Sequence, residues 1–184
     1  MFLRILFLAS AAATVAAFLY PAFRDLLLIA LPCAIASAIL LLQSIRRGRK
    51  DWVIVDGSNV MFWKTGAPDI RAVREVVDEL RARGLTPCVV FDANAGYRLI
   101  GQYQHDKALS SQLDLPASRV MVVPKGSPAD PYILKAARDH RAQIVSRDQF
   151  RDWSEAHPEI GTPGHLVKGG YRGGKLWLAL DREV

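Results

Sequence analysis

The sequence predicts an α/β protein with a mostly parallel central sheet, helices on both faces of that sheet and a β-hairpin at its end. Short, continuously apolar runs, which are typical of strands buried on both faces, alternate with stretches of helical periodicity. Such alternation indicates a parallel sheet covered by helices. Two long apolar runs precede this region, and they predict a pair of transmembrane helices.

The chain of 184 residues has room for one domain of ordinary size after an apolar N-terminal part. Between Met1 and Ile45 the only charged residues are Arg4, Arg24 and Asp25. We therefore expect a transmembrane helical hairpin over residues 1–45, a basic linker over 46–51 and the folded domain over 52–184.

Phe2–Tyr20 is apolar apart from Arg4, and Leu26–Leu42 is a second apolar run of about 17 residues, near the lower limit for a membrane span. The cluster Arg46–Lys50 follows the second run. Because basic residues that flank a span stay in the cytoplasm, we expect a membrane protein, of the bacterial inner membrane, whose domain is cytoplasmic. A cleaved signal peptide, suggested by the small residues at 11–17, and a soluble helical hairpin are the alternatives.

The net charge of +6 favours polyanionic partners, such as nucleic acid or anionic lipid. Four of the cations lie in the cluster beside the predicted membrane segment, so the charge by itself says little about RNA binding. Cys33 and Cys88 have no neighbouring Cys or His in a zinc-binding pattern.

Four apolar runs are predicted as strands, at 52–56, 87–92, 119–123 and 143–146. Helices are predicted at 68–83, 97–113, 129–141 and 149–156. The tail, His165–Leu180, predicts a hairpin whose glycine-rich turn is 169–174.

Four aspartates follow the ends of these strands: Asp56, Asp92, Asp130 and Asp148. Ligands of an open parallel sheet bind beyond the carboxyl ends of the strands, so we expect the four side chains to meet at one edge. Clustered carboxylates raise one another's pKa, and a hard divalent cation such as Mg²⁺ or Mn²⁺ relieves the repulsion. A metal held in this way supports phosphodiester hydrolysis.

Each acid also has a structural explanation. Asp130 and Asp148 are suited to cap helices, and Asp92 to form a turn. Asp56 is harder to explain in this way, because a carboxylate directly after a buried strand is costly without a ligand or hydrogen bonds.

The segment Val53–Val60, which reads Val-Ile-Val-Asp-Gly-Ser-Asn-Val, resembles the opening motif of NYN-domain nucleases. More narrowly, it resembles the Regnase-like branch of the PIN-like superfamily. Segments 89–92, 129–134 and 145–153 fit the same family, and the terminal hairpin is similar to the family's end. The resemblance covers residues 52–180.

The resemblance implies a three-layer PIN-like α/β fold and a metal-dependent endoribonuclease that cleaves single-stranded or stem-loop RNA. It assigns catalytic roles to Asp56, Asn59, Asp130 and Asp148. The metal, Mg²⁺ or Mn²⁺, would bind Asp56, Asp130 and Asp148, with Asp92 as a further candidate. PIN-like domains often pair, so a homodimer is also considered. One departure is Ala129, because Regnase-type proteins carry two adjacent acids there, and this puts metal affinity in doubt.

Basic residues near the acids are expected to contact RNA phosphates: Lys125 and Arg147 first, because their loops flank the acids, then Arg151 and Arg98. Tyr97, Tyr132 and Trp153 could stack on unpaired bases, although the last two are more easily explained as core residues.

The sequence lacks the motifs of other classes of nucleotide-binding or phosphate-transferring proteins. There is no GxxxxGK[ST] and no GxGxxG after the first strand, and Ser58 stands where a HAD-like phosphatase requires an acid. The remaining alternative is a catalytically inactive PIN-like module that binds RNA or a membrane partner. Ala129 favours that alternative, whereas retention of the four residues with predicted catalytic roles argues against it.

Overall fold

The computed structural model describes residues 2–46 and 51–180 of the chain, which forms two compact units, Met1–Lys50 and Asp51–Val184. Residues 47–50 of the predicted basic linker lie outside the described part.

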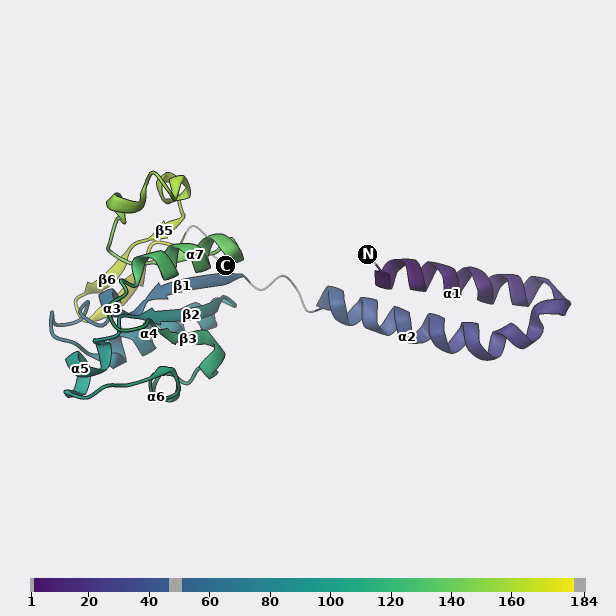
Figure 1. Cartoon of the computed structure of the whole chain (residues 1–184), viewed down its shortest axis with the longest axis horizontal. Helices are drawn as coiled ribbons and strands as arrows, with labels where there is room; N and C mark the ends of the chain where they lie inside the picture. Colours follow the sequence, from purple (N-terminus) through teal and green to yellow (C-terminus); the bar gives the residue numbers. More distant parts are fainter. Residues whose placement is uncertain (1, 47–50, 181–184) are drawn as a thin grey trace. The chain divides into compact units, whose positions relative to one another are not determined.

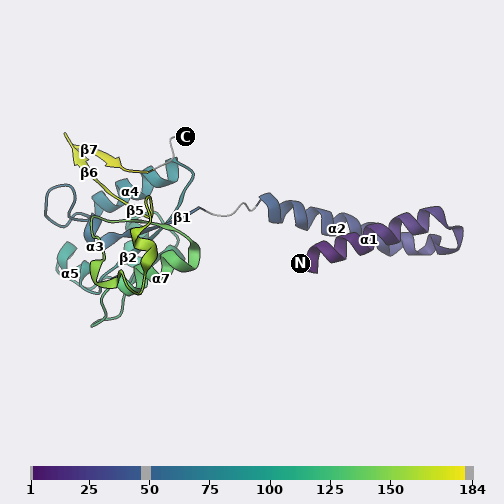
Figure 2. The same ribbon diagram turned by 90° about the horizontal axis from the view of Figure 1, so that it is seen from above.

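The N-terminal unit is a helical hairpin of α1 (Phe2–Leu19), a 3₁₀ turn η1 (Pro21–Leu26) and α2 (Leu27–Arg46). The two helices lie side by side (Figures 1 and 2). Their buried residues are small, namely Ser10, Ala17, Ala30 and Ser37. Small side chains let two helix backbones approach closely. Most of the larger apolar side chains of both helices are exposed.

One described segment, Pro21–Leu42, is long and apolar enough to cross a membrane. Ile5–Leu19 is an apolar helix below that length. Two spanning helices were expected, and in the described residues one segment, Pro21–Leu42, has the length and composition that a span requires.

The second unit contains a five-stranded sheet in which every pair is parallel, as predicted. Its strands are β1 (Trp52–Asp56), β2 (Thr86–Phe91), β3 (Val120–Val122), β4 (Gln143–Val145) and β5 (Leu166–Val167), in the order β3-β2-β1-β4-β5. Since β1 is central and pairs with both β2 and β4, the carboxyl ends of these three strands are neighbours.

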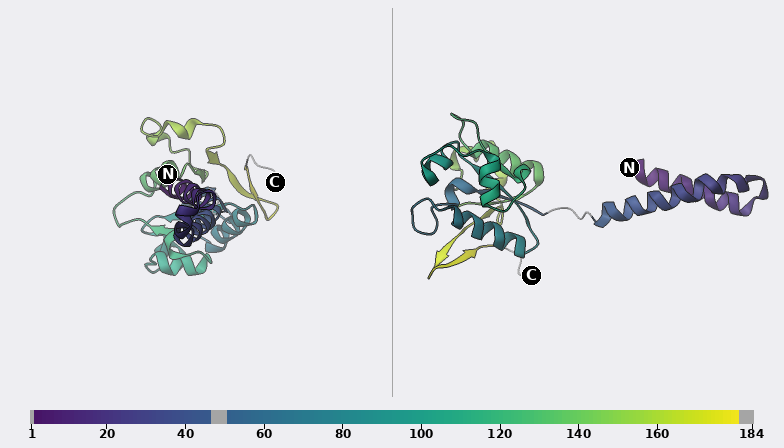
Figure 3. Two further views of the ribbon diagram at one scale, coloured as in Figure 1. Left: turned by 90° about the vertical axis from the view of Figure 1, so that its right-hand side faces the viewer. Right: turned by 90° about the horizontal axis from the view of Figure 1, so that it is seen from below.

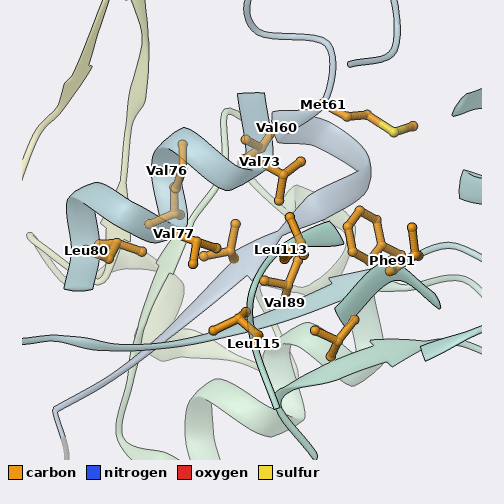
Figure 4. Close-up of a cluster of buried hydrophobic side chains, with 14 of the residues drawn as sticks. Val60, Met61, Val73, Val76, Val77, Leu80, Val89, Phe91, Leu113 and Leu115 are labelled. Carbon is orange, nitrogen blue, oxygen red and sulfur yellow. The ribbon is translucent and has the colours of Figure 1, made fainter. Parts of the chain in front are cut away.

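Helices cover both faces of the sheet, which gives three layers. α4 (Ile70–Ala82) and α6 (Asp106–Gln112) pack on one face with Val53 and Val55, while α7 (Asp130–His140) packs on the other face with Ile54 (Figure 1). Successive residues of a strand point to opposite faces, so a strand covered on both sides is apolar throughout. Figure 4 shows the first of these two cores, where the valines of α4 meet β2.

The predicted helix over 97–113 is two helices, α5 (Ala95–Ile100) and α6. Gly101 ends α5 in the left-handed region, with φ of 72°. A glycine in this conformation terminates a helix, and it reverses the chain here before α6 begins.

The predicted helix over 149–156 is also wrong, because the described segment holds only a 3₁₀ turn, η3 (Arg151–Trp153). The buried residue before it, Phe150, has φ of 49°. Its N–H donates a 2.9 Å hydrogen bond to Oδ1 of Asp148, which closes a tight turn instead of opening an α-helix. Two further short 3₁₀ turns are η2 (Ala117–Arg119) and η4 (Pro158–Gly161).

The C-terminal hairpin exists, but its arms were predicted wrongly. Leu166 and Val167 belong to the main sheet, and the hairpin consists of β6 (Gly169–Arg172) and β7 (Lys175–Leu178) (Figure 3). Its turn is Gly173-Gly174, and both residues have positive φ, as a two-residue hairpin turn requires.

Two glycines that the sequence suggested for the turn lie in strand β6 and serve close packing. A Cβ on Gly169 would come within 2.6 Å of the Trp63 and Leu178 side chains. A Cβ on Gly170 would collide with the guanidinium of Arg147. A glycine-rich stretch therefore marks a strand against which bulky side chains pack.

Candidate active site

Asp56 is the last residue of β1 and the N-cap of the short helix α3 (Gly57–Val60). Its side chain is 6% exposed. Oδ1 accepts a hydrogen bond of 3.1 Å from the N–H of Asn59, and Oδ2 accepts one of 2.8 Å from the hydroxyl of Ser146, at the end of β4. The buried carboxylate is thus held at one oxygen by α3 and at the other by the residue that follows β4.

Burial raises the pKa of Asp56 from its ordinary value of 3.8 to about 7. The negative charges of Asp130 and Asp92 raise it further, while the hydrogen bonds from Ser146 and Asn59 lower it. Near neutral pH this carboxyl group therefore exchanges a proton easily, which is typical of functional sites.

Asp130 is the first residue of α7 and is half-buried. Burial raises its pKa, and so do the charges of Asp148, Asp92 and Asp152, in that order, while a hydrogen bond from Trp153 lowers it. Asp130 makes no side-chain capping bond, because the residue in the N-cap position is Ala129. The helix-cap explanation for Asp130 therefore fails.

Asp148 follows β4 and is exposed. Its N–H donates a hydrogen bond of 3.0 Å to the Ser146 hydroxyl, the same hydroxyl that donates to Asp56. Its Oδ1 accepts the N–H of Phe150, so Asp148 does form a local turn. The helix-cap explanation for Asp148 is therefore wrong, because the N-cap of η3 is Phe150, and one carboxylate oxygen of Asp148 is engaged in the turn instead.

Asp92 directly follows β2, and its N–H donates a 2.7 Å hydrogen bond to the hydroxyl of Ser58 in α3. That bond ties the end of β2 to α3, the helix that Asp56 caps. Strand ends β1, β2 and β4 are thus joined by two serine hydroxyls, Ser58 and Ser146.

The side-chain oxygen of Asn59 accepts two hydrogen bonds, from the indole N–H of Trp63 at 2.7 Å and from the backbone N–H of Arg147 at 3.1 Å. Asn59 thereby connects α3 to the loop after β4. In this arrangement its oxygen is committed to protein groups, and its geometry is that of a positioning residue.

Arg147 is also engaged with the protein frame. Its Nε donates a 2.9 Å hydrogen bond to the carbonyl of Gly169, and its guanidinium lies 5.1 Å from the centre of the Trp63 ring. Arg151 and Lys125 are exposed, and Arg98 is exposed with its guanidinium 5.8 Å from the Phe62 ring.

The carboxylate oxygens at this edge are ligands of the kind that a hard divalent cation prefers. The carboxylates also raise one another's pKa, and a bound cation would relieve that repulsion. Among residues 2–46 and 51–180, however, no three acidic, His or Cys side chains lie close enough together to hold an ion. The carboxylates interact electrostatically, and a metal would require their side chains to turn toward one another.

Ser146, Ser58 and Trp63 are parts of the site that the sequence prediction did not include. Ser146 is fully buried directly after a buried strand, and a polar residue at such a place indicates a hydrogen-bonding role. No local pattern points to Trp63, because its contact with Asn59 is recognised only once α3 is known to be helical.

A protein-family model, the Zc3h12a-like Ribonuclease NYN domain, matches residues 49–163, which is more than half of the chain. The chain belongs to this family. The match includes β1 to β4 and ends before β5 and the β6–β7 hairpin. The NYN domain therefore contains every acid described above, and it is a ribonuclease-type domain.

The fold of the NYN domain is also found in a solved structure, the nuclear proteinaceous RNase P 2 (PRORP2) from A. thaliana. It is 19% identical to this chain over 78% of the chain's length, with a TM-score of 0.52. A second structure of PRORP2 from Arabidopsis thaliana is 20% identical over 74% of the chain, with a TM-score of 0.47. The chain spans about a third of these proteins, 32% and 31%. A search of curated proteins finds no match.

Proposed function

We propose that the protein is a metal-dependent endoribonuclease tethered to the cytoplasmic face of a membrane. The observation that carries the proposal is the buried Asp56, which is held by Ser146 from the neighbouring strand and lies within electrostatic reach of Asp92 and Asp130. In an NYN domain, this arrangement supports hydrolysis of RNA.

Asp56, Asp130 and Asp148 would hold Mg²⁺ or Mn²⁺, with Asp92 as a further candidate. When bound, such an ion polarises a phosphoryl oxygen and makes a bound water more acidic. The protein's own groups supply orientation. Ser146 directs Oδ2 of Asp56, and Asn59 directs Oδ1 through its N–H.

Substrate phosphates would be met by cations that flank the acids, namely Lys125, Arg151 and Arg98, all of which are exposed. Arg147 remains a candidate, although its Nε and its backbone N–H are engaged with Gly169 and Asn59. Single-stranded or looped RNA is the proposed substrate class, because an edge built from strand ends and short loops is open to a flexible chain.

The proposed tether is the segment Pro21–Leu42. In the helical hairpin, large apolar residues stand exposed, for example Phe18 (82%), Leu28 (81%) and Ile29 (69%). Such a surface is more stable in contact with lipid than with water. Arg46–Lys50 would keep the domain in the cytoplasm. Extraction of the membranes of producing cells with carbonate tests this proposal, because a protein recovered in the soluble fraction is not tethered.

The nuclease proposal is tested with the full chain in detergent and a fluorescently labelled stem-loop RNA. Cleavage is followed in Mg²⁺, in Mn²⁺ and in EDTA for the wild type, for Asp56→Asn and for Asp139→Asn. Asp139 is a matched control, because it is an exposed aspartate on α7 that pairs with Lys135 away from the strand ends. We expect metal-dependent cleavage that Asp56→Asn abolishes and Asp139→Asn retains.

A catalytically inactive RNA-binding module is the second candidate. It is favoured by Ala129, which stands where the resemblance expects an acid, and by the carboxylates that are not gathered around a common point among the described residues. If the wild type and Asp56→Asn bind the RNA equally and neither cuts it with any metal, this second function replaces the first.

A further inference from the structure

Two tyrosines form an exposed aromatic surface just beyond the end of β2. Tyr97, on α5, is 57% exposed, and Tyr103, in the loop after α5, is 56% exposed. Their ring centres are 6.4 Å apart. Ile100, one helical turn from Tyr97, is also 56% exposed. We call Tyr97, Ile100 and Tyr103 the α5 platform.

The α5 platform is unusual within the domain. In residues 51–180 the large apolar side chains that stand exposed are these three and Met121. Three of the four therefore fall within seven consecutive positions. Single exposed apolar residues are ordinary on protein surfaces, whereas a contiguous group of them marks a binding surface.

The platform is held in shape by close backbone packing. Gly96, in α5, lies so close to Gln102 and Gln104 that a Cβ at this position would collide with their backbone atoms. Gln104 in turn accepts a 3.2 Å hydrogen bond from the side-chain amide of Gln112 in α6. Because the loop is fixed against both helices, Tyr103 is kept beside Tyr97 before any partner binds, which reduces the entropic cost of binding.

The platform lies at the same end of the sheet as the candidate active site. Tyr97 follows Asp92 by five residues. The next residue, Arg98, places its guanidinium 5.8 Å from the ring of Phe62, which follows α3. Figures 1 and 2 both place α5 beside α3 at the end of the sheet where β1 ends.

The surroundings of the rings favour RNA over a protein partner. Both rings carry hydroxyl groups, and the exposed polar residues near them in the chain are Asn94, Arg98, Gln102, His105, Asp106 and Lys107. A dry protein interface would be depleted of such charged and polar residues. Aromatic faces beside cations are the usual means of binding unpaired nucleotides, since any base can stack on them.

We propose that the α5 platform stacks unpaired bases of the RNA next to the scissile phosphate and gives the enzyme its preference for single strands. The inference rests on the proposed function, because it assumes that the substrate is RNA. It extends that function by assigning the substrate feature that is recognised and the residues that recognise it.

Binding in EDTA tests the platform without cleavage. The full chain in detergent is titrated against a labelled 12-nucleotide single strand and against a duplex of the same sequence, followed by fluorescence anisotropy. The variants are Tyr97→Ala/Tyr103→Ala and the ring-retaining Tyr97→Phe/Tyr103→Phe. We expect the alanine pair to weaken binding of the single strand by about tenfold or more for each ring removed, and to leave duplex binding unchanged. The phenylalanine pair should bind like the wild type.

Several results would overturn the inference. These are equal losses on both RNAs, no loss on either, or a phenylalanine pair as weak as the alanine pair. Light scattering supplies another: if the alanine pair turns a dimer into monomers and RNA binding stays the same, the rings form a subunit contact. Failure of the nuclease proposal is separate, because it would show as absent cleavage by the wild type while the difference in binding persists.

Discussion

The hydroxyl of Ser146, at the end of β4, donates a 2.8 Å hydrogen bond to Oδ2 of Asp56, at the end of β1. The same oxygen of Ser146 accepts the N–H of Asp148. One fully buried hydroxyl therefore fixes the distance between two of the acids proposed to act on RNA.

Ser146→Ala should weaken both the fold and the site. Loss of a buried hydrogen bond to a carboxylate costs about 1–3 kcal/mol of unfolding free energy. Because this bond lowers the pKa of Asp56, its removal should raise that pKa and move the acid limb of the pH–rate profile to higher pH. Cleavage rates measured across pH check this shift. A pH profile identical to that of the wild type would show that the hydroxyl has no influence on the reacting carboxyl group.

Asp56 should make the domain less stable as the pH rises. Its pKa is about 7 in the folded chain and near the ordinary 3.8 when unfolded, so the folded state holds an extra proton between these values. The associated stabilisation is complete below pH 3.8 and is lost as the pH rises through 7, by at most about 4 kcal/mol. Urea unfolding followed by tryptophan fluorescence measures it, since all four tryptophans lie in the domain. Asp56→Asn should remove the slope, and equal slopes in both proteins would contradict the prediction.

Asn59→Ala should destabilise the domain by about 2 kcal/mol or more, because it leaves the N–H groups of Trp63 and Arg147 without an acceptor. Asn59→Asp keeps an acceptor for both groups and should cost less stability. Its added charge, three residues from Asp56, should also raise the pKa of Asp56. The comparison is made by the same fluorescence measurement, and equal losses in the two variants would exclude the positioning role.

Gly169→Ala and Gly170→Ala form a matched pair in β6. At Gly169 the new methyl group would meet the Trp63 ring, Leu178 and a backbone carbonyl, so we expect a loss of about 2–3 kcal/mol. At Gly170 it would meet the end of the flexible Arg147 side chain, which can move away at a cost of about 1 kcal/mol. Chemical denaturation measures the unfolding free energy of both variants. A larger loss for Gly170→Ala than for Gly169→Ala would contradict the prediction that Gly169 is the more tightly packed of the two.

Addition of Mn²⁺ should raise the unfolding temperature of the wild type, and EDTA should return it to the metal-free value. A ligand at a hundred times its Kd stabilises by about 2.7 kcal/mol. The increase should be larger at pH 8 than at pH 6, since the ion competes with the proton on Asp56. Asp56→Asn should lose the effect and Asp139→Asn should keep it. A shift of equal size in all three proteins would indicate metal binding elsewhere.

The parallel sheet could be predicted from the sequence because its central strands are buried on both faces and are therefore apolar throughout. The residue that ends a helix could also be recognised from the sequence, since Gly84 follows α4 and has a φ of 75°. Local patterns failed where tertiary packing decides the conformation. Gly169 and Gly170 read as a turn, but they are strand residues that accommodate Trp63 and Arg147.

The positions of the four aspartates at strand ends followed from the order of apolar runs. The contacts that hold them did not, because Asp56 and Ser146 are ninety positions apart and their hydrogen bond leaves no local pattern. Arg147 illustrates the same limit. The sequence placed it near the acids, whereas its bond to Gly169 and its contact with Trp63 depend on β6 lying beside the loop after β4.

The strand order has a consequence for the timing of synthesis. β1 is made first among the strands, but it pairs with β4, so Asp56 cannot receive the Ser146 hydroxyl until most of the domain has left the ribosome. Contacts between residues far apart in the chain form late, since a long loop must close first. A nascent chain that ends before β4 carries Asp56 without Ser146 or Asp148. The site proposed to act on RNA can therefore be assembled only after β4 has been synthesised.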